Sequence, residues 1–575
     1  MDEKLHNLRH SLAHLLASAA LEHDPEAKLA IGPAIEDGFY YDIEFSSGKT
    51  PAPETLLVLE EAMRDLASQN LSFEGRGVTL EEARKKFSNN PYKLEIIEEL
   101  GKSGDEITFY QTGDFVDLCR GGHVKNTGEI NPQAFKLTRL AGAYWRGNEK
   151  NPMLTRIYGV AFETEEELMK HLALLEEAKK RDHKRLGKEL GLFMFHETAP
   201  GMPYWLPKGL VVYNELVNYW RQEHAALGYQ ETASPLVNKS DLWKISGHWE
   251  HYRDDMFIAD MGENEVYGIK PMNCPNAMLV FQSMQVSYRD LPLRLSDTDR
   301  LHRYERSGTL NGLLRARSFQ QDDAHNFVSE DMIESEFKHI FEVCKKFYGI
   351  FVLEYSFRLG TRPDQFLGEI STWDRAEVAL KNILEKSGRP YSVAEKDGAF
   401  YGPKIDILMK DALGREWQMG TVQLDFQIPA RFELSYTDKD GSKKTPAVIH
   451  RVIYGSLERF IGILIEHYAG AFPTWLAPVQ AIVLPIGEKH REYAQEVCKV
   501  LKEKSIRAEV DVSDESLGKR IRNAKLQKIP YLLVVGDKEV EAENTSVEHR
   551  DQGQIGTISV IELTEKIEKE IREKR

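Results

Sequence analysis

The stretch RYERSGTLNGLLRARSFQQDDAHNF, residues 303–327, constrains the fold of this chain more than any other. In an extended strand, residues two apart face the same side, so Arg303 and Glu305 present a guanidinium and a carboxylate together. A glycine-containing loop follows, and Arg315 and Phe319 come after it. Arginine forks fit phosphate oxygens, and an aromatic ring stacks on a base. The pattern indicates a hairpin that is either a nucleotide site or a surface hairpin with ion pairs.

A second stretch, GSLERFIGILIEHYAG at residues 455–470, favours the nucleotide interpretation. Gly455 precedes an apolar run with helical spacing, and Arg459 falls in its first turns. Free N–H groups at the start of a helix bind anions, so a helix start with an arginine predicts a phosphate site. Upstream, the run ETASPLV at residues 231–237 reads as a strand with Pro235 near its end.

The order of patterns along the chain predicts several domains. The length of 575 residues suggests roughly four of them. Residues 163–193 form a long helical pattern, acidic early and basic late, which suits the helix dipole and predicts a linker helix. A large middle region follows, in which apolar strands alternate with helices. Beyond residue 476, strands and helices with βαβ spacing predict a C-terminal α/β unit.

Composition argues against several classes of protein. The formal net charge of −16 speaks against nonspecific coating of nucleic acid but leaves a structured RNA partner open. No apolar run approaches the roughly 20 residues needed to cross a bilayer, and MDEKLHNLRH lacks the apolar stretch of a signal peptide. The four cysteines lie far apart, which argues against a disulfide framework. We therefore expect a cytoplasmic protein without a membrane segment.

Two pairs of potential metal ligands lie near the N-terminus. His10 and His14 stand four apart in a helical run, and Cys119 and His123 stand four apart in CRGGH. Residues i and i+4 share one face of a helix and suit a metal ion. From the residues alone, three interpretations stay open: a Cys/His₃ zinc site, a catalytic cluster, or histidines satisfied within a core.

At this point the chain resembles a known family. Pro235, the stretch from Arg303-x-Glu305 to Phe319, and Glu458-Arg459 after Gly455 are similar to motifs 1, 2 and 3 of class II aminoacyl-tRNA synthetases. Five longer stretches resemble threonyl-tRNA synthetases in particular: KPMNCP (270–275), RSFQQDDAH (317–325), AFYGPKID (399–406), WQMGTVQLDF (417–426) and VIHRVIYGSLERF (448–460). The resemblance covers essentially the whole chain.

The resemblance implies an α+β multidomain fold. Its parts would be an α+β editing domain (1–162), a linker helix (163–190), an antiparallel-sheet class II catalytic core (191–475) and a C-terminal α/β anticodon-binding domain (476–575). The implied enzyme activates L-threonine with ATP and transfers it from the adenylate to tRNA(Thr). Because the motif 1 strand forms the subunit interface in this family, a homodimer is expected.

The resemblance also implies roles for residues of the middle region. Arg303 would hold the α-phosphate of ATP, Glu305 would contact the adenine side, and Phe319 would stack on adenine. Arg315 and Arg459 would bind the outer phosphates together with Mg²⁺. Asp323 would accept a hydrogen bond from the amino group of threonine. The remaining implied active-site positions are His248, Gln423, Tyr401 and Lys404, with Gln321 and Gln418 as further substrate contacts.

In the family, three residues hold one Zn²⁺ per subunit, and here they would be Cys274, His325 and His450. Three protein ligands leave zinc an open position, which the family fills with the amino group and hydroxyl of threonine. Valine has nearly the same shape but no hydroxyl, and an apolar pocket would reject it only about a hundredfold. Zinc is thus expected to recognise the substrate.

Serine also carries the hydroxyl, and one methyl group is worth only about 1–3 kcal/mol. The family therefore hydrolyses Ser-tRNA(Thr) in a second site, built on the HxxxH and CxxxH pairs. Bacterial relatives run this site without a metal, and we expect the same of His10, His14, Cys119 and His123. Three further positions match the family around that pocket: Tyr41, Lys93 and Asp117.

The chain departs from the family's pattern in three places. Bacterial relatives often begin with a ubiquitin-like (TGS) domain, whereas this sequence begins at the editing domain. Relatives often read CPGH where Cys274 is followed by Pro-Asn-Ala. For the anticodon, Glu539 matches, but a basic position reads Glu548, so Arg550 would have to substitute. The alternatives are another class II synthetase, such as a prolyl enzyme, and a non-catalytic regulator that binds tRNA or an amino acid.

Overall fold

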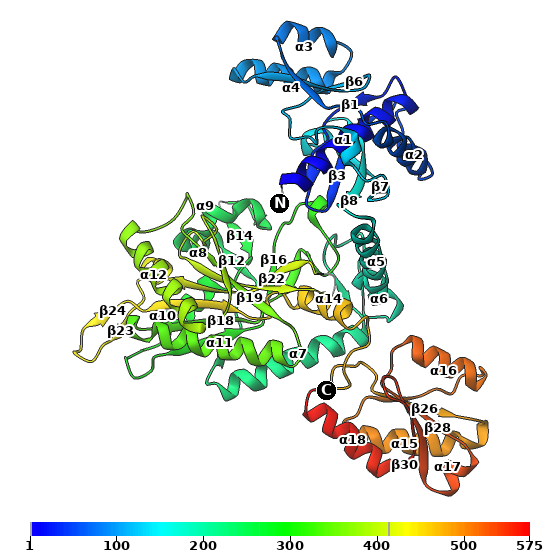
Figure 1. Cartoon of the computed structure of the whole chain (residues 1–575). Helices are drawn as coiled ribbons and strands as arrows, with labels where there is room; N and C mark the ends of the chain where they lie inside the picture. Colours follow the sequence, from blue (N-terminus) through cyan, green and yellow to red (C-terminus); the bar gives the residue numbers. More distant parts are fainter. Residues whose placement is uncertain (1–2, 264, 412–413) are drawn as a thin grey trace. The chain divides into compact units, whose positions relative to one another are not determined.

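The computed structural model describes residues 3–263, 265–411 and 414–575, and it divides into two compact units, Met1–Glu176 and Glu177–Arg575. The first unit is drawn in blue and cyan in Figure 1. In it the long helix α1 (Glu3–His23) packs its apolar side against the sheet β1-β3-β8-β7 and against α2. The bounds are β1 Lys28–Leu29, β2 Ala34–Ile35, β3 Gly38–Glu44, α2 Thr55–Ser68, β7 Phe135–Tyr144 and β8 Met153–Ala161.

A smaller sheet, β4-β5-β6, completes the first unit together with α3 and α4. Helix α4 (Pro91–Ser103) begins at a strong start signal, because the Asn90 side chain accepts hydrogen bonds from the N–H groups of Tyr92 and Lys93. Lys93 therefore lies in a fixed first turn. The other bounds are β4 Glu74–Val78, α3 Leu80–Lys86, β5 Ile107–Thr112 and β6 Phe115–Leu118.

The centre of the second unit is an eight-stranded sheet with the order β11-β15-β18-β25-β22-β21-β19-β20. All neighbours are antiparallel except β11 with β15 and β19 with β20. The apolar residues of one sheet face join the core formed with α7, α11 and α14. The bounds are α7 Pro207–Ala226, β11 Gln230–Glu231, β15 Leu293–Asp297, β18 Asp323–Val328, α11 Ile333–Gly349, β19 Tyr355–Gly360, β20 Tyr391–Ala394, β21 Lys404–Lys410, β22 Glu416–Asp425, β25 Ala447–Val452 and α14 Leu457–His467.

The C-terminal α/β unit was expected from sequence, and its elements form as predicted. Strands β26 (Ala481–Pro485), β27 (Ala508–Val510) and β28 (Tyr531–Val535) pair in parallel, which βαβ spacing requires. Two antiparallel strands extend the sheet to the order β27-β26-β28-β29-β30 (orange to red in Figure 1). The other bounds are α15 Arg491–Glu503, α16 Leu517–Leu526, β29 Asn544–His549, β30 Gly553–Ser559 and α18 Val560–Arg572.

Three local expectations need correction. The predicted linker is two helices, α5 (Glu165–Arg181) and α6 (His183–Glu189), because Asp182 leaves the helical conformation and caps α6 by accepting from the Lys184 N–H. Pro235 lies between short strands, since β11 ends at Glu231 and β12 begins at Val237. Arg303 and Glu305 follow strand β16 (Arg300–His302) and are not part of it.

Among the described residues, no helix combines the length and the apolarity that crossing a bilayer requires. The predicted boundaries at 162, 190 and 475 stay predictions, because the division into two units falls within α5.

Two ion pairs on α11 predict very different contributions to stability. Glu336 is buried and accepts two hydrogen bonds from Arg294, at 2.7 and 2.8 Å, and one from Asn326. Glu336→Ala leaves a largely buried guanidinium without its partner, so we expect a loss of about 2–3 kcal/mol in the free energy of unfolding of the second unit. Glu334 pairs with Lys386 at 2.6 Å, but both side chains are over 60% exposed. Glu334→Ala should cost less than about 1 kcal/mol. Urea unfolding monitored by tryptophan fluorescence measures both variants, and equal losses would contradict the expectation.

Candidate functional site

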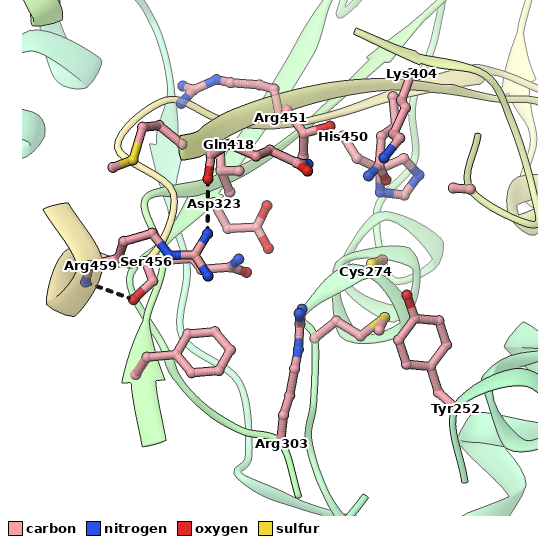
Figure 2. Close-up of a pocket in the computed structure, with 18 of the residues that line it drawn as sticks. Tyr252, Cys274, Arg303, Asp323, Lys404, Gln418, His450, Arg451, Ser456 and Arg459 are labelled. Carbon is pink, nitrogen blue, oxygen red and sulfur yellow. Dashed lines mark hydrogen bonds between the residues drawn. The ribbon is translucent and has the colours of Figure 1, made fainter. Parts of the chain in front are cut away.

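A cavity of about 650 Å³ opens beside the central sheet of the second unit. Most of the residues expected in the active site line it (Figure 2). They are Cys274, Arg303, Glu305, Arg315, Phe319, Gln321, Asp323, His325, Tyr401, Lys404, Gln418, Gln423, His450 and Arg459. These residues span almost 190 positions of the sequence, so tertiary folding alone brings them together.

Strand register explains how four of them share one side of the sheet. His325 on β18 is opposite His450 on β25, His450 is opposite Gln423 on β22, and Gln423 is opposite Lys404 on β21. Residues directly opposite each other on neighbouring strands project to the same face. The four side chains therefore form a row across the sheet, and the neighbouring positions Val422, Ile449 and Ile405 enter the apolar core.

Three residues of the cavity can hold a metal ion. Single ligand atoms of Cys274, His325 and His450 all lie within 4.8 Å of one another. Both ring nitrogens of His325 and the Nδ1 of His450 are buried without a hydrogen-bond partner in the part of the chain that the structure describes. The Nε2 of His450 lies 2.9 Å from an Asp425 oxygen, an arrangement that orients metal-binding histidines. One thiol and two imidazoles with free nitrogens fit zinc.

Arg459 lies across the cavity from Cys274 and His450 (Figure 2), and Arg303 and Arg315 also line the cavity. Arg459 donates from Nε to the Leu314 carbonyl at 2.9 Å and from Nη1 to the Gln418 carbonyl at 2.8 Å (Figure 2). The Arg303 guanidinium lies 5.2 Å from the centre of the Phe319 ring. Arg315 pairs with Glu305 at 2.8 Å. The two positive groups near Arg459 and its burial lower its pKa, with burial the larger cause. This end suits a polyanion.

Asp323 carries a buried carboxylate between these two ends. Asn273 donates to it at 3.2 Å and to Asp297 at 2.6 Å, so one amide orients both carboxylates. Burial raises the pKa of Asp323 to about 6. Asn273 was not predicted, although it stands directly before Cys274 in the KPMNCP stretch. Other lining residues that sequence analysis missed include Tyr252 and Arg451.

His248 differs from the expectation. Its side chain is fully buried behind the cavity lining, next to Phe400 and Tyr401, and its Nδ1 contacts the Ser246 hydroxyl at 2.8 Å. Burial lowers its pKa to about 3, with a smaller contribution from His450. A histidine acts best as a proton acceptor when its pKa lies near neutrality, and burial moves His248 away from that range. Tyr401 instead donates a hydrogen bond to Gln423, and Lys404 contacts Asp406 at 3.1 Å.

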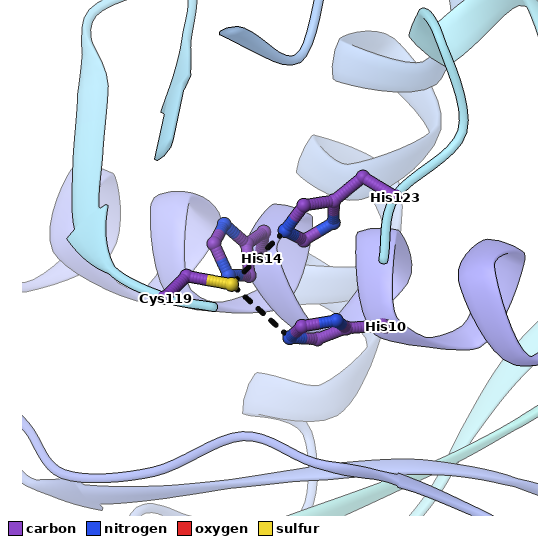
Figure 3. Close-up of side chains that lie close together, drawn as sticks. All are labelled: His10, His14, Cys119 and His123. Carbon is purple, nitrogen blue, oxygen red and sulfur yellow. Dashed lines mark hydrogen bonds between the residues drawn. The ribbon is translucent and has the colours of Figure 1, made fainter. Parts of the chain in front are cut away.

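The two N-terminal pairs meet in the first unit. His10, His14, Cys119 and His123 converge, and the Cys119 Sγ lies 3.2 Å from the His123 Nε2 and 3.5 Å from the His10 Nε2 (Figure 3). Burial raises the pKa of the thiol to about 11 and lowers the pKa of His123 to about 2, with His14 and His10 contributing to the latter. The cluster is therefore uncharged at neutral pH. The four ligand atoms lie within 4.8 Å of one another, a spacing that also fits a metal, so metal-free editing stays a prediction.

Next to this cluster, a cavity of about 400 Å³ contains the other predicted editing residues. Lys93 contacts an Asp117 oxygen at 2.6 Å and donates to the Tyr41 hydroxyl at 3.1 Å, and Tyr41 donates to Asp117. All three side chains are buried. The positive charge of Lys93 thus lies at the wall of a cavity, held by a carboxylate and a phenol.

Hydrogen bonds assign the proton positions in the cluster. The Ser11 hydroxyl has one proton, which it donates to the Asn7 carbonyl, and it accepts from the Val124 N–H. Its 3.2 Å contact with the His123 Nδ1 is then satisfied only if that nitrogen carries a hydrogen. The Nδ1 of His10 faces the Gly122 carbonyl at 3.2 Å and must donate as well. Both histidines therefore present an unprotonated Nε2 to the Cys119 thiol.

The predicted anticodon residues have internal partners. Glu539 accepts from the Gly536 N–H at the start of α17 (Asp537–Glu541). Arg550 donates to the carbonyls of Phe472 and Lys528 and pairs with Asp551. These contacts neither require nor forbid a role in RNA binding, so both residues stay predictions.

Comparison with known families identifies the class of protein. Residues 257–468 match the family described as tRNA synthetase class II core domain (G, H, P, S and T). Residues 480–570 match an anticodon-binding domain, and residues 107–158 match the threonyl and alanyl tRNA synthetase second additional domain. These three matches define a class II aminoacyl-tRNA synthetase core with an editing and an anticodon-binding domain, and they confirm the predicted fold class.

Individual relatives show to which family within this class the chain belongs. The threonine–tRNA ligase of Clostridium botulinum (strain Okra) is 51% identical over 569 residues, which are 99% of this chain and 89% of that protein. The enzyme of the same name from Caldanaerobacter subterraneus subsp. tengcongensis is 50% identical over 98% of this chain and 87% of that protein. The solved RNA-binding domain of Cryptosporidium parvum threonyl-tRNA synthetase is 42% identical, with a TM-score of 0.66, and the match covers 68% of this chain and 98% of that chain. The chain therefore belongs to the threonine–tRNA ligase family.

The proton positions in the N-terminal cluster predict a spectroscopic result. In ¹⁵N-histidine spectra of the whole protein, His123 should show a protonated Nδ1 and an unprotonated Nε2, because Ser11 accepts from Nδ1. Ser11→Ala removes that acceptor and should shift the ring toward a mixture of tautomers. Ser103→Ala, on the exposed end of α4, serves as the control. A protonated Nε2 in the unaltered protein would contradict the assignment.

Proposed function

We propose that the large cavity activates threonine and that the cavity of the first unit edits the product. Membership of the family makes the chain an ATP-dependent ligase that attaches threonine to tRNA and carries an editing domain. The observation that supports the site assignment most is the convergence of the metal-type triad and the three motif arginines on one cavity. A non-catalytic regulator would have no need for both.

Activation requires the carboxylate of threonine to lie in line with the α-phosphorus of ATP while developing charge is neutralised. We assign Arg303 to the α-phosphate and Phe319 to the adenine ring. Arg315 and Arg459 would bind the outer phosphates, with Mg²⁺ sharing their charge, as is general for ATP in this class of enzyme. Glu305 now pairs with Arg315, and this pair holds the arginine at the cavity before ATP arrives.

At the other end, Cys274, His325 and His450 would hold Zn²⁺. When bound, the ion supplies an open coordination position for the amino group and hydroxyl of threonine. Asp323 would accept from the amino group, and Asn273 would keep its carboxylate in place. Gln321 and Gln418 complete the proposed substrate contacts. The role of His248 in transfer to tRNA stays a prediction, and its burial makes it a support for Tyr401 in this conformation.

In the first unit, Lys93 would orient a water molecule and the seryl ester, with Asp117 and Tyr41 fixing its ammonium group. The unprotonated Nε2 atoms of His10 and His123 offer hydrogen-bond acceptors beside them. The C-terminal α/β domain would bind the anticodon of tRNA. A homodimer and a cytoplasmic location stay predictions of the family resemblance.

Amino-acid-dependent ATP–pyrophosphate exchange tests the activation site. Metal-replete protein should exchange strongly with threonine, weakly with serine and almost not at all with valine or proline, because valine lacks the hydroxyl that zinc would bind. Cys274→Ser should lose the single tightly bound zinc, measured by mass spectrometry of the metal, together with threonine exchange. Cys498→Ser, in the C-terminal domain, is the matched control. Full zinc content in Cys274→Ser, or exchange with none of the amino acids, would refute the assignment.

Hydrolysis of Ser-tRNA(Thr) tests the editing site. Lys93→Met should lower the rate at least about a hundredfold, because it removes the charged group from the cavity wall. Lys102→Met, on the same helix but exposed, should leave hydrolysis unchanged. Threonine-dependent exchange should be normal in both variants, since activation takes place in the other unit. Normal hydrolysis by Lys93→Met would exclude the proposed role.

A further inference from the structure

A buried histidine lies outside both cavities and was not assigned any role. His183 is the first residue of α6, is separated from the end of α5 by Asp182 alone, and is 1% exposed. The N–H of Leu313 donates to its Nε2 at 3.1 Å, and its Nδ1 lies 2.8 Å from a Glu466 oxygen. Because a backbone amide can only donate, Nε2 is unprotonated and Nδ1–H must donate to Glu466. Both ring nitrogens are therefore in use, which leaves neither free for a metal ion.

The partner of Nε2 belongs to the loop that leads into the phosphate end of the large cavity. Leu313 and Leu314 are buried, and the Leu314 carbonyl accepts the 2.9 Å hydrogen bond from Arg459. Arg315 is the next residue. A short path thus runs from His183 through two successive residues, Leu313 and Leu314, to both arginines that are proposed to bind the outer phosphates of ATP.

Two glycines allow this close approach. Gly312 has a φ of +53°, and a Cβ atom there would lie 2.4 Å from the His183 Nε2. Gly462 of α14 packs on the same loop, where a Cβ atom would lie 3.1 Å from a Leu314 methyl group. On the other side of His183, Glu466 is held by Arg415 at 2.5 Å. Glu466 therefore fixes His183 on one side, and on the other side His183 holds the loop that contains Leu313.

We infer that His183 is a positioning residue for amino-acid activation. By accepting from the Leu313 N–H it fixes the end of the motif 2 loop, so that Arg315 and Arg459 keep their spacing at the phosphate end of the cavity. The inference rests on the proposed roles of those two arginines. Only Asp182 separates His183 from α5, so the same residue ties the segment after that helix to the loop at the proposed ATP site.

Two substitutions separate the acceptor from the rest of the side chain. His183→Asn places an amide N–H near the position of Nδ1, so it keeps the donor to Glu466 but has no acceptor for Leu313. His183→Gln can carry its amide oxygen to the position of Nε2 and restore that acceptor. In ATP–pyrophosphate exchange, KM for ATP should rise about five- to tenfold in His183→Asn and return to within about twofold in His183→Gln. KM for threonine should stay unchanged in both, and His196→Asn, an exposed histidine, is the matched control.

Hydrogen exchange supplies a readout that does not depend on activity. The amide of Leu313 should exchange faster in His183→Asn than in His183→Gln. Gly312→Ala leaves the histidine intact but crowds its Nε2, so it should raise KM for ATP in the same way. If His183→Asn does not fold, the KM for ATP of Gly312→Ala tests the positioning role in its place. An unchanged KM for ATP in the folded asparagine variant, or equal losses for ATP and threonine, would overturn the inference.

Arg459→Lys, measured alongside, separates the proposed phosphate role of Arg459 from the positioning role of His183. A normal KM for ATP in Arg459→Lys would defeat the proposed phosphate role itself. A raised KM in Arg459→Lys with a normal KM in His183→Asn would defeat only the positioning role of His183.

Discussion

The register of the central antiparallel strands is the constraint on which the large cavity depends. His325, His450 and Gln423 face the cavity only because their strands pair at these positions. A slip of one residue would turn every side chain of a strand to the opposite face. The apolar residues between them fix the register, since they must enter the core behind the sheet. Asp322 also fixes the end of β25, because its carboxylate accepts hydrogen bonds from the N–H groups of Ile453 and Gly455 where β25 leads into α14.

The hydrogen bonds of Asp322 connect the two ends of the cavity. Asp322 precedes β18, which carries the metal-type histidine, and Gly455 precedes the helix that carries Arg459. The site for the proposed zinc ion and the site for the proposed nucleotide are thus held by one short run of hydrogen bonds. Unpartnered polar atoms are costly in a protein interior. The free nitrogens of His325 are therefore most readily explained by a ligand that the folded protein is built to receive.

The editing cluster differs in charge from the large cavity. Its histidines and its thiol are uncharged because burial disfavours their ionised forms, and the buried charges beside them are those of the Lys93–Asp117 pair. Glu106 and Arg120 also line the cavity. The oriented acceptors of His10 and His123 can bind a water molecule or an ester group. The large cavity differs, because four arginines line it: Arg303, Arg315, Arg451 and Arg459.

Sequence alone determined the family, the order of the domains and many of the polar residues that line the two cavities. The family could be recognised from long local stretches, such as those around Arg303 and Cys274, because their residues match the family's motifs independently of the rest of the chain. Local signals also placed the strands and helices of the C-terminal domain correctly. The break at Asp182 was missed, because a helical pattern of charges does not show where a side chain caps a new helix.

Only the tertiary structure decided which atoms meet and in what state. The gaps between Cys274, His325 and His450 carry no spacing signal, since the contact between them comes from strand register. The burial of His248, which lowers its pKa to about 3, depends on rings far away in sequence. The same holds for His183, whose partners lie more than a hundred residues further along the chain. Burial and hydrogen-bond geometry arise from packing between distant segments. For that reason sequence patterns could name the metal-type residues and His248 but not His183, and they could not assign protons or partners to any of them.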